Sequence, residues 1–176
     1  MAIHLSRDGI ESKFNQLAES PKDRGVVECV VLRLPEEQRE TPQEVEVSPE
    51  GGLHGDRWGS VTTPNVRAQI SMMNSHFLRL VAGSDERISL AGDNLLVDLD
   101  LSKENLPAGT KLQIGTATFE VTDLPHTGCL KFERRYGTDA LEFVNSEAYA
   151  SKRLRGLFVR VTKPGKIQVG DAIHKI

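Results

Sequence analysis

The sequence has only two cysteines, Cys29 and Cys129, and they do not form a Cys-x-x-Cys pair. Small disulfide frameworks and structural zinc sites need several cysteines at short spacing, so the composition argues against both. The fold must therefore be stabilised by a hydrophobic core. We expect the reducing environment of a cytoplasm.

Long apolar runs are also missing. The longest, residues 26–34, is interrupted by Glu28, Cys29 and Arg33, whereas a membrane-spanning helix needs about 20 consecutive apolar residues. The first residues lack a basic segment followed by an apolar one, so we expect no signal peptide. The sequence predicts no membrane partner.

Positive charge is not in excess. The chain has 22 Lys and Arg against 25 Asp and Glu, which gives a net charge of −3. General binding to nucleic acid is therefore not expected, although a local basic pocket is compatible with this balance. The 176 residues contain 38% hydrophobic and 27% charged residues. These values are typical of one soluble globular domain.

The apolar pattern predicts many short strands and few helices. Strands are expected at residues 25–34, 45–47, 66–72, 95–97, 111–114, 117–121, 157–162, 167–169 and 172–176. Helices are expected at residues 6–19, 76–82 and 130–136, and at 138–144 with Thr138 as the cap. The charged residues 35–42 are expected to form a mobile surface loop.

These roughly seven to nine strands at short spacing exclude a doubly wound fold and predict a β-rich α+β domain. The architecture expected is a β-barrel with several short peripheral helices. Residues 1–24 are expected to form an N-terminal helical extension, and residues 25–176 the barrel domain.

Cys129 is the main candidate for chemistry. It follows a glycine where a loop is expected to enter a helix, and Lys131, Arg134 and Arg135 come within the next two turns. A thiol at such a place ionises more easily, and the thiolate attacks, carries sulfur or binds metal. Adjacent arginines point about 100° apart on a helix, so only one of the two is expected to face a pocket.

Other residues near this segment allow two interpretations each. His126 either contacts a ligand or adjusts the pKa of the thiol, or it only shapes a turn. Arg153 and Arg155 either bind a phosphate or face water and acidic residues. Cys29 has no activating cation beside it in the sequence, so we expect a small core residue.

Residues 51–59 contain four glycines around His54, Asp56, Arg57 and Trp58. Glycines allow positive φ angles and close approach of a ligand. One interpretation is a turn held in shape by an Asp–Arg pair. The other is a pocket edge, where Arg57 meets an anion and Asp56 orients it.

Four segments, in this order, resemble the MOSC domain, which is the C-terminal domain of molybdenum-cofactor sulfurase and also occurs alone. Residues 52–57 resemble the Gly-x-x-Gly-Asp-Arg loop of the family, and residues 92–95 resemble its Gly-Glu-Asn-Leu turn. Residues 125–129 resemble its cysteine segment. Residues 153–156 and 165–171 resemble its C-terminal end. The resemblance extends from about residue 25 to the C-terminus.

The resemblance implies a β-rich barrel with peripheral helices and a molybdenum–pterin cofactor. Cys129 matches the cysteine that ligates molybdenum in members that bind the cofactor, and soft thiolate sulfur suits such a metal. The implied activity removes oxygen from N-hydroxylated compounds, with electrons from a separate protein. The cofactor-binding residues expected on this basis are Gly55, Asp56, Arg57, Asn94, His126, Arg134 and Arg153.

The sequence also departs from the family. Asp93 stands where the family turn has Glu, and His126 and Gly128 stand where many members have Arg and Pro. From these 176 residues we expect neither the electron-delivery domain nor the pyridoxal-phosphate domain of larger members. Two other functions remain open. In one, Cys129 carries a persulfide received from a separate cysteine desulfurase, for assembly of a cofactor or metal–sulfur cluster. In the other, the barrel is a non-catalytic module that binds a small molecule.

Overall fold

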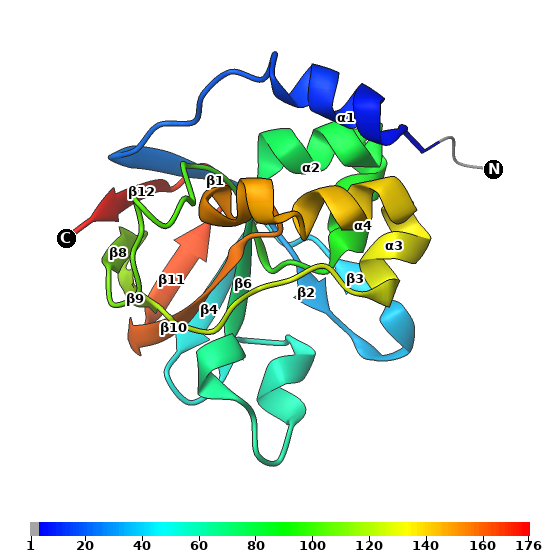
Figure 1. The fold of residues 1–176 in the computed structure, drawn as a ribbon. Helices are drawn as coiled ribbons and strands as arrows, with labels where there is room; N and C mark the ends of the chain where they lie inside the picture. Colours follow the sequence, from blue (N-terminus) through cyan, green and yellow to red (C-terminus); the bar gives the residue numbers. More distant parts are fainter. Residues whose placement is uncertain (1–3) are drawn as a thin grey trace.

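The computed structural model describes residues 4–176, and its centre is a closed seven-stranded barrel (Figure 1). Around the barrel the strands follow the order β1, β12, β8, β9, β10, β6, β7. Their bounds are β1 Arg24–Val30, β6 Ile70–Asn74, β7 Leu95–Asp98, β8 Lys111–Ile114, β9 Ala117–Val121, β10 Leu157–Lys163 and β12 Ala172–Lys175. All neighbours are antiparallel except β6 and β7, which are parallel. The predicted β-barrel is confirmed.

Alternation along the strands fills the barrel. In β9 the side chains of Ala117, Phe119 and Val121 are buried, while the residues between them are partly exposed. The same period of two places Leu112 and Ile114 of β8 in the core. Because the sheet closes on itself, its main strands have no unpaired edge.

Two small sheets extend from the barrel. One has the order β11 (Gly165–Gln168), β4 (Glu44–Ser48), β5 (Gly52–Leu53), and the other pairs β2 (Leu32–Arg33) with β3 (Arg39–Glu40). The first leads into the glycine-rich loop. The second forms a hairpin that α3 (Leu130–Tyr136) contacts through the ion pairs of Glu37 with Lys131 and Arg135 (Figure 1).

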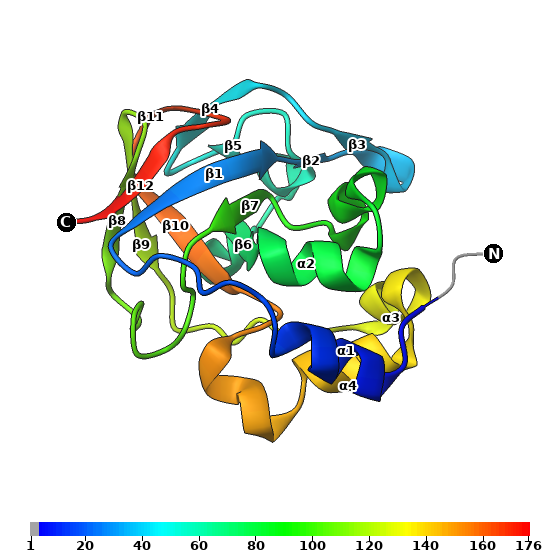
Figure 2. The same cartoon turned by 90° about the horizontal axis from the view of Figure 1, so that it is seen from above.

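The helices gather on one side of the barrel (Figure 2). They are α1 (Arg7–Phe14), α2 (Ser75–Ala82), α3 and α4 (Thr138–Val144). The described residues also form five 3-10 turns: η1 Pro35–Glu37, η2 Arg57–Ser60, η3 Val66–Ala68, η4 Asp85–Ala91 and η5 Glu147–Lys152. The four helices share a second hydrophobic core with η4 and η5. In it the ring of Phe14 meets Phe77, Phe143 and Tyr149 edge-on, at centroid distances of 5.8, 5.6 and 5.4 Å. The N-terminal segment is thus packed on the helices of the domain.

Several predicted elements agree closely with the structure. The side chain of Asn74 caps α2 by accepting from the N–H of Phe77, and Gly83 ends it in a left-handed conformation. The β8–β9 hairpin turns at residues 115–116 as expected. Of the twelve strands in the described part of the chain, nine are longer than two residues, which matches the upper predicted number. None of the helices within residues 4–176 has the length and apolarity that a bilayer crossing requires.

Other predictions were wrong in detail. The first helix ends at Phe14, five residues early. The strand expected over 25–34 breaks at Val31, whose N–H donates to the carbonyl of Asn94 instead of to a strand neighbour. The strand expected from Val66 begins at Ile70, because Asn65 caps a 3-10 turn first.

Two further corrections concern capping and the charged loop. Thr138 does not cap α4; its hydroxyl donates to the carboxylate of Glu133, and Gly137 occupies the cap position. Residues 35–42 are not an irregular loop throughout, because they contain η1 and β3. Within η1, Glu36 and Glu37 both have positive φ, at 55° and 60°, which is uncommon for residues other than glycine.

The glycine before β10 offers a test of the fold. Gly156 has φ +100°, and a Cβ there would lie 2.1 Å from the carbonyl oxygen of Met72. Gly170 has a similar φ of +93° but open space around it. Gly170→Ala is expected to cost about 1–2 kcal/mol through left-handed strain alone. Gly156→Ala is expected to cost about 1–3 kcal/mol more, because the backbone must also shift.

Urea unfolding followed by circular dichroism measures both changes. Equal losses in the two variants would show that the contact with Met72 does not constrain the barrel.

Candidate functional site

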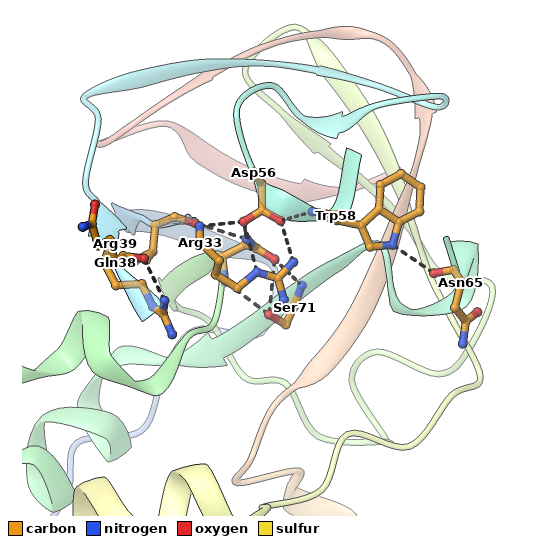
Figure 3. A network of polar contacts seen from close by, with 9 residues as sticks. Arg33, Gln38, Arg39, Asp56, Trp58, Asn65 and Ser71 are labelled. Carbon is orange, nitrogen blue, oxygen red and sulfur yellow. Dashed lines mark hydrogen bonds and ion pairs between the residues drawn. The ribbon is translucent and has the colours of Figure 1, made fainter. Parts of the chain in front are cut away.

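Asp56 is the centre of a buried hydrogen-bond network (Figure 3). Its side chain is 1% exposed, and the carboxylate accepts five hydrogen bonds. Three come from Arg33, through its backbone N–H (2.7 Å), Nε (3.0 Å) and Nη2 (2.7 Å). The others come from the N–H of Trp58 and the side-chain amide of Asn94, both at 3.0 Å. Asp56 thus holds the glycine-rich loop against β2.

Arg33 also lowers the pKa of the Asp56 carboxylate. Burial by itself would raise the pKa of Asp56, but hydrogen bonds and charge from Arg33 outweigh it, so the pKa lies below the usual range. Asp56 therefore pairs with Arg33 of β2 and not, as expected, with an arginine of its own loop.

Asn94 joins the glycine-rich loop to the turn at residues 92–95. Its amide nitrogen donates to Asp56 and to the carbonyl of Val31, and its oxygen accepts from the N–H of Ser71 at 3.1 Å. Two segments that are 38 residues apart thus share one hydrogen bond. Asp56 and Asn94 were both predicted to bind the cofactor. In the structure, their side chains form hydrogen bonds that hold these segments together.

Four arginines converge beside this network. The pKa of Arg39 is lowered by burial first, then by the charges of Arg135, Arg57 and Arg33, while Glu37 opposes the shift. The Nε of Arg39 is buried and has no hydrogen-bond partner. We call Arg33, Arg39, Arg57 and Arg135 the arginine cluster.

Gly92 lies under the arginine cluster. A Cβ at Gly92 would lie 3.3 Å from Nη2 of Arg39 and 3.8 Å from Nη1 of Arg135. Gly92 also has φ +78°, so glycine suits both the turn and the approach of the two guanidinium groups. Glu37 reaches across from the hairpin and pairs with Lys131 (2.6 Å) and Arg135 (3.1 Å) of α3.

A second buried polar group lies behind the cysteine segment. Asp93 is fully buried and accepts from Nη1 of Arg155 at 2.6 Å. Its other carboxylate oxygen lies 3.6 Å from Nδ1 of His126, whose ring packs on Phe158 at 4.3 Å between centroids. Burial lowers the pKa of His126 to about 4, although the charge of Asp93 opposes the shift.

Cys129 stands at the cap position of α3 with an exposed side chain that makes no capping hydrogen bond. The residue before it is firmly held. The N–H of Gly128 donates to Asn145 at 2.7 Å, and the amide of Asn145 donates back to the carbonyl of Gly128 at 3.2 Å. A Cβ at Gly128 would meet Leu141 at 2.6 Å and Val144 at 2.9 Å. The backbone of the segment is thus fixed while the thiol faces solvent.

The other predicted residues occupy different places. Arg57 is exposed at the start of η2 and belongs to the arginine cluster. Arg134 is exposed on α3, whereas its neighbour Arg135 is half-buried and faces the cluster. The guanidinium of Arg153 donates to the carbonyls of Leu101 (3.4 Å) and Leu106 (2.6 Å), so it braces a loop.

Arg33 and Arg39 were missed by sequence reasoning. Arg33 interrupts an apolar strand, which is a weak signal for a buried charge. Arg39 lies among exposed residues of the hairpin and carries no local signal, because its neighbours Gly92 and Arg135 come from segments distant in sequence.

A groove of about 840 Å³ lies on another side of the glycine-rich loop. Gly55 and Asp56 line it, together with His54, Thr116 and Lys166. Neither Cys129 nor a member of the arginine cluster lines this groove. Gly55 thus faces the groove rather than the surroundings of the thiol.

Potential metal ligands are grouped elsewhere. Among residues 4–176, one set of three His, Cys, Asp or Glu side chains has its ligand atoms within 4.8 Å of one another, and it consists of Glu28, His76 and Asp98. Glu28 in this set already pairs with Arg79. Within the described part of the chain, Cys129 belongs to no such set.

Comparison with known proteins identifies the family. The model of the MOSC domain matches residues 53–174. The chain belongs to the MOSC domain family. The family is linked to binding of the molybdenum cofactor. No curated protein matches this sequence.

Solved structures show the same fold. YuaD from Bacillus subtilis aligns with a TM-score of 0.58 and 17% identity, over 87% of this chain and 97% of that one. YiiM from Geobacillus stearothermophilus aligns with a TM-score of 0.58 and 17% identity, over 86% and 75% of the two chains. YiiM from Escherichia coli gives a TM-score of 0.55 and 18% identity, over 86% and 69%. This MOSC protein therefore shares their architecture.

The Asp56 network predicts a large effect of a small substitution. Asp56→Asn leaves the half-buried Arg33 without its countercharge, so the free energy of unfolding should fall by about 3 kcal/mol or more. Asp123→Asn is the matched control. It removes the exposed pair with Arg67, in which the Asp123 side chain is 69% exposed, and should cost less than about 1 kcal/mol.

Denaturant unfolding at pH 7 compares the two variants. Because folding lowers the pKa of Asp56, its stabilisation is present above the ordinary carboxyl pKa of about 4 and is lost as pH falls through the folded value. The difference between wild type and Asp56→Asn should therefore shrink in acid. A difference that stays constant with pH would contradict the ion pair.

The two cysteines should differ in reactivity. Cys29 is partly buried, its Sγ lies 3.7 Å from the carbonyl of Val30, and burial raises the pKa of its thiol. Cys129 is exposed. Iodoacetamide should alkylate Cys129 faster by on the order of tenfold or more, as peptide mass spectrometry measures. Cys129→Ser should leave only the slow reaction, and equal rates at both thiols would refute the difference.

Proposed function

We propose that this MOSC protein binds a molybdenum–pterin cofactor, with Cys129 as the molybdenum ligand and the arginine cluster as the phosphate site. The observation that carries the proposal is the arginine cluster, in which the buried Nε of Arg39 has no partner. α3 joins the two parts, because Cys129 precedes its first residue and Arg135 lies in its last turn.

The arginine cluster fits an anion for electrostatic reasons. Arg33 is neutralised by Asp56, and Arg135 shares Glu37 with Lys131. Arg39 is repelled by three arginines and has one ion-pairing group, Glu37, in its surroundings. A phosphate would relieve this repulsion and accept from the planar guanidinium forks.

Cys129 fits a soft metal centre. Its thiol is exposed on a fixed segment and is not used in capping α3. When bound, the cofactor supplies a redox-active molybdenum, for which a thiolate is a suitable ligand. The chain's own residues bind the phosphate, hold the thiol in place and leave it open to solvent.

The activity we propose for the loaded protein is reduction of N-hydroxylated compounds. In R–NHOH + 2H⁺ + 2e⁻ → R–NH₂ + H₂O, the N–O bond breaks and the oxygen leaves as water. The electrons come from a separate electron-transfer protein, as the family resemblance implies.

Molybdenum content tests the proposal. The protein is purified without oxygen from a host that makes the cofactor, and molybdenum is measured by inductively coupled plasma mass spectrometry. Wild type should retain the metal, and Cys129→Ser should lose it. Arg39→Gln and Arg135→Gln should lose pterin and metal together. Arg134→Gln is the matched control, because it removes an exposed arginine of the same helix, and it should retain both.

Wild type without molybdenum would refute the proposal, as would an equal loss in Arg134→Gln and Arg135→Gln.

The exposed single thiol favours a sulfur carrier as the second candidate. The thiolate of Cys129 would attack the outer sulfur of a desulfurase persulfide, and the desulfurase thiolate would leave. A metal-free protein that gains about 32 Da on incubation with a cysteine desulfurase and cysteine would support this function instead.

A further inference from the structure

Three buried polar atoms behind the cysteine segment have no hydrogen-bond partner: Oδ1 of Asp93, Nδ1 of His126 and Nε of Arg155. Their side chains are 0%, 11% and 6% exposed. A buried polar atom without a partner is costly, so such atoms in one cluster need an explanation.

The distance between Asp93 and His126 suggests what the cluster does. Oδ1 and Nδ1 are 3.6 Å apart, which is just beyond hydrogen-bond length, whereas a bridging water would need about 5 Å between its partners. A movement of less than about 1 Å would therefore make a direct bond. No other group among the hydrogen bonds of the described residues competes for either atom.

Neighbouring groups hold both partners in place. Arg155 binds the opposite oxygen of Asp93 at 2.6 Å and lies over the ring of Phe132, with 4.9 Å from Cζ to the centroid. Since a carboxylate paired with a guanidinium has only acceptor oxygens, Asp93 can accept a hydrogen bond from His126 but has none to donate. The ring of His126 is packed on Phe158. With Arg155 on the other oxygen of Asp93, the atoms that face each other are Oδ1 of Asp93 and Nδ1 of His126.

Nδ1 of His126 is closed to solvent, whereas Nε2 is not fully buried and makes no hydrogen bond with the described residues. If Nδ1 carries the proton, Nε2 has the free lone pair. His126 lies three residues before Cys129 on the segment that leads to the thiol.

We propose that Asp93 is a positioning residue that fixes His126 as the Nδ1–H tautomer, so that Nε2 accepts a hydrogen bond from an N–H or O–H group of the ligand bound at Cys129. The inference rests on the proposed function for the identity of that ligand. It adds a specificity element to the site, because the arginine cluster selects an anionic group while Nε2 of a neutral imidazole selects a donor.

The tautomer can be measured directly. Long-range ¹H–¹⁵N correlation spectra of labelled, cofactor-free protein at pH 7 distinguish protonated from unprotonated ring nitrogens. His126→Gln identifies the signals. We expect Nδ1 of His126 to be protonated and Nε2 to be bare, and the opposite tautomer in wild type would overturn the proposal.

Asp93→Asn gives a sharper test. Arg155 has only donors, so it will take the amide oxygen of Asn and turn the NH₂ group toward His126. Nδ1 must then accept, and the proton moves to Nε2. The tautomer should invert, while His54, His76 and His174 serve as internal controls. Asp93→Glu keeps a carboxylate and should retain the Nδ1–H tautomer, and it remains informative if Asp93→Asn does not fold. An unchanged tautomer in a folded Asp93→Asn variant would show a merely structural role for Asp93, and an inverted tautomer in Asp93→Glu would also overturn the proposal.

The ligand is tested by a second spectrum on the molybdenum-loaded protein. The Nε2 resonance should move in the direction of an accepted hydrogen bond, and an unchanged resonance would overturn the acceptor role. The two proposals fail separately. A protein that binds no molybdenum but shows the expected tautomer contradicts the proposed function alone, and a loaded protein with the opposite tautomer contradicts the inference alone.

Discussion

The arrangement of the site depends on the buried ion pair between Asp56 and Arg33. One carboxylate receives five hydrogen bonds from β2, η2 and the turn before β7. A buried charge without its partner is strongly unfavourable, so these three segments must meet in one arrangement. Through Asn94, the same contact sets the position of Gly92 and Asp93 at the turn. Gly92 of this turn lies under the arginine cluster, and Asp93 of the same turn lies beside His126 and Arg155.

The site combines two kinds of electrostatic environment. In the arginine cluster, the positive charges outnumber the nearby carboxylates, so the cluster favours an added anion. Around His126, Asp93 and Arg155 neutralise each other, and the imidazole stays neutral because it is buried. Cys129 belongs to neither environment and lies exposed at the start of α3, which carries Arg135.

Local patterns predicted most of the barrel. The sequence predicted the alternation over β8 and β9. It also predicted that Asn74 caps α2 and that Gly83 ends it, because each of these features depends on neighbours in the chain. The break at Val31 was not, because its cause is a hydrogen bond to Asn94, 63 residues away. For the same reason Arg57, adjacent to Asp56, looked like its partner, although Arg33 lies closer in space.

By itself, the sequence determined the barrel class, the placement of a lone cysteine at a helix start and the four segments that resemble the MOSC family. These features follow from periodicity, capping residues and short motifs, all of which act over a few residues. Only the tertiary structure decided which charges belong to the site. Arg39 and Arg135 come from a hairpin and a helix that are distant in sequence, and the burial that distinguishes them from the exposed Arg134 arises when these elements pack. Burial and pairing of a charge depend on long-range contacts, which no local pattern specifies.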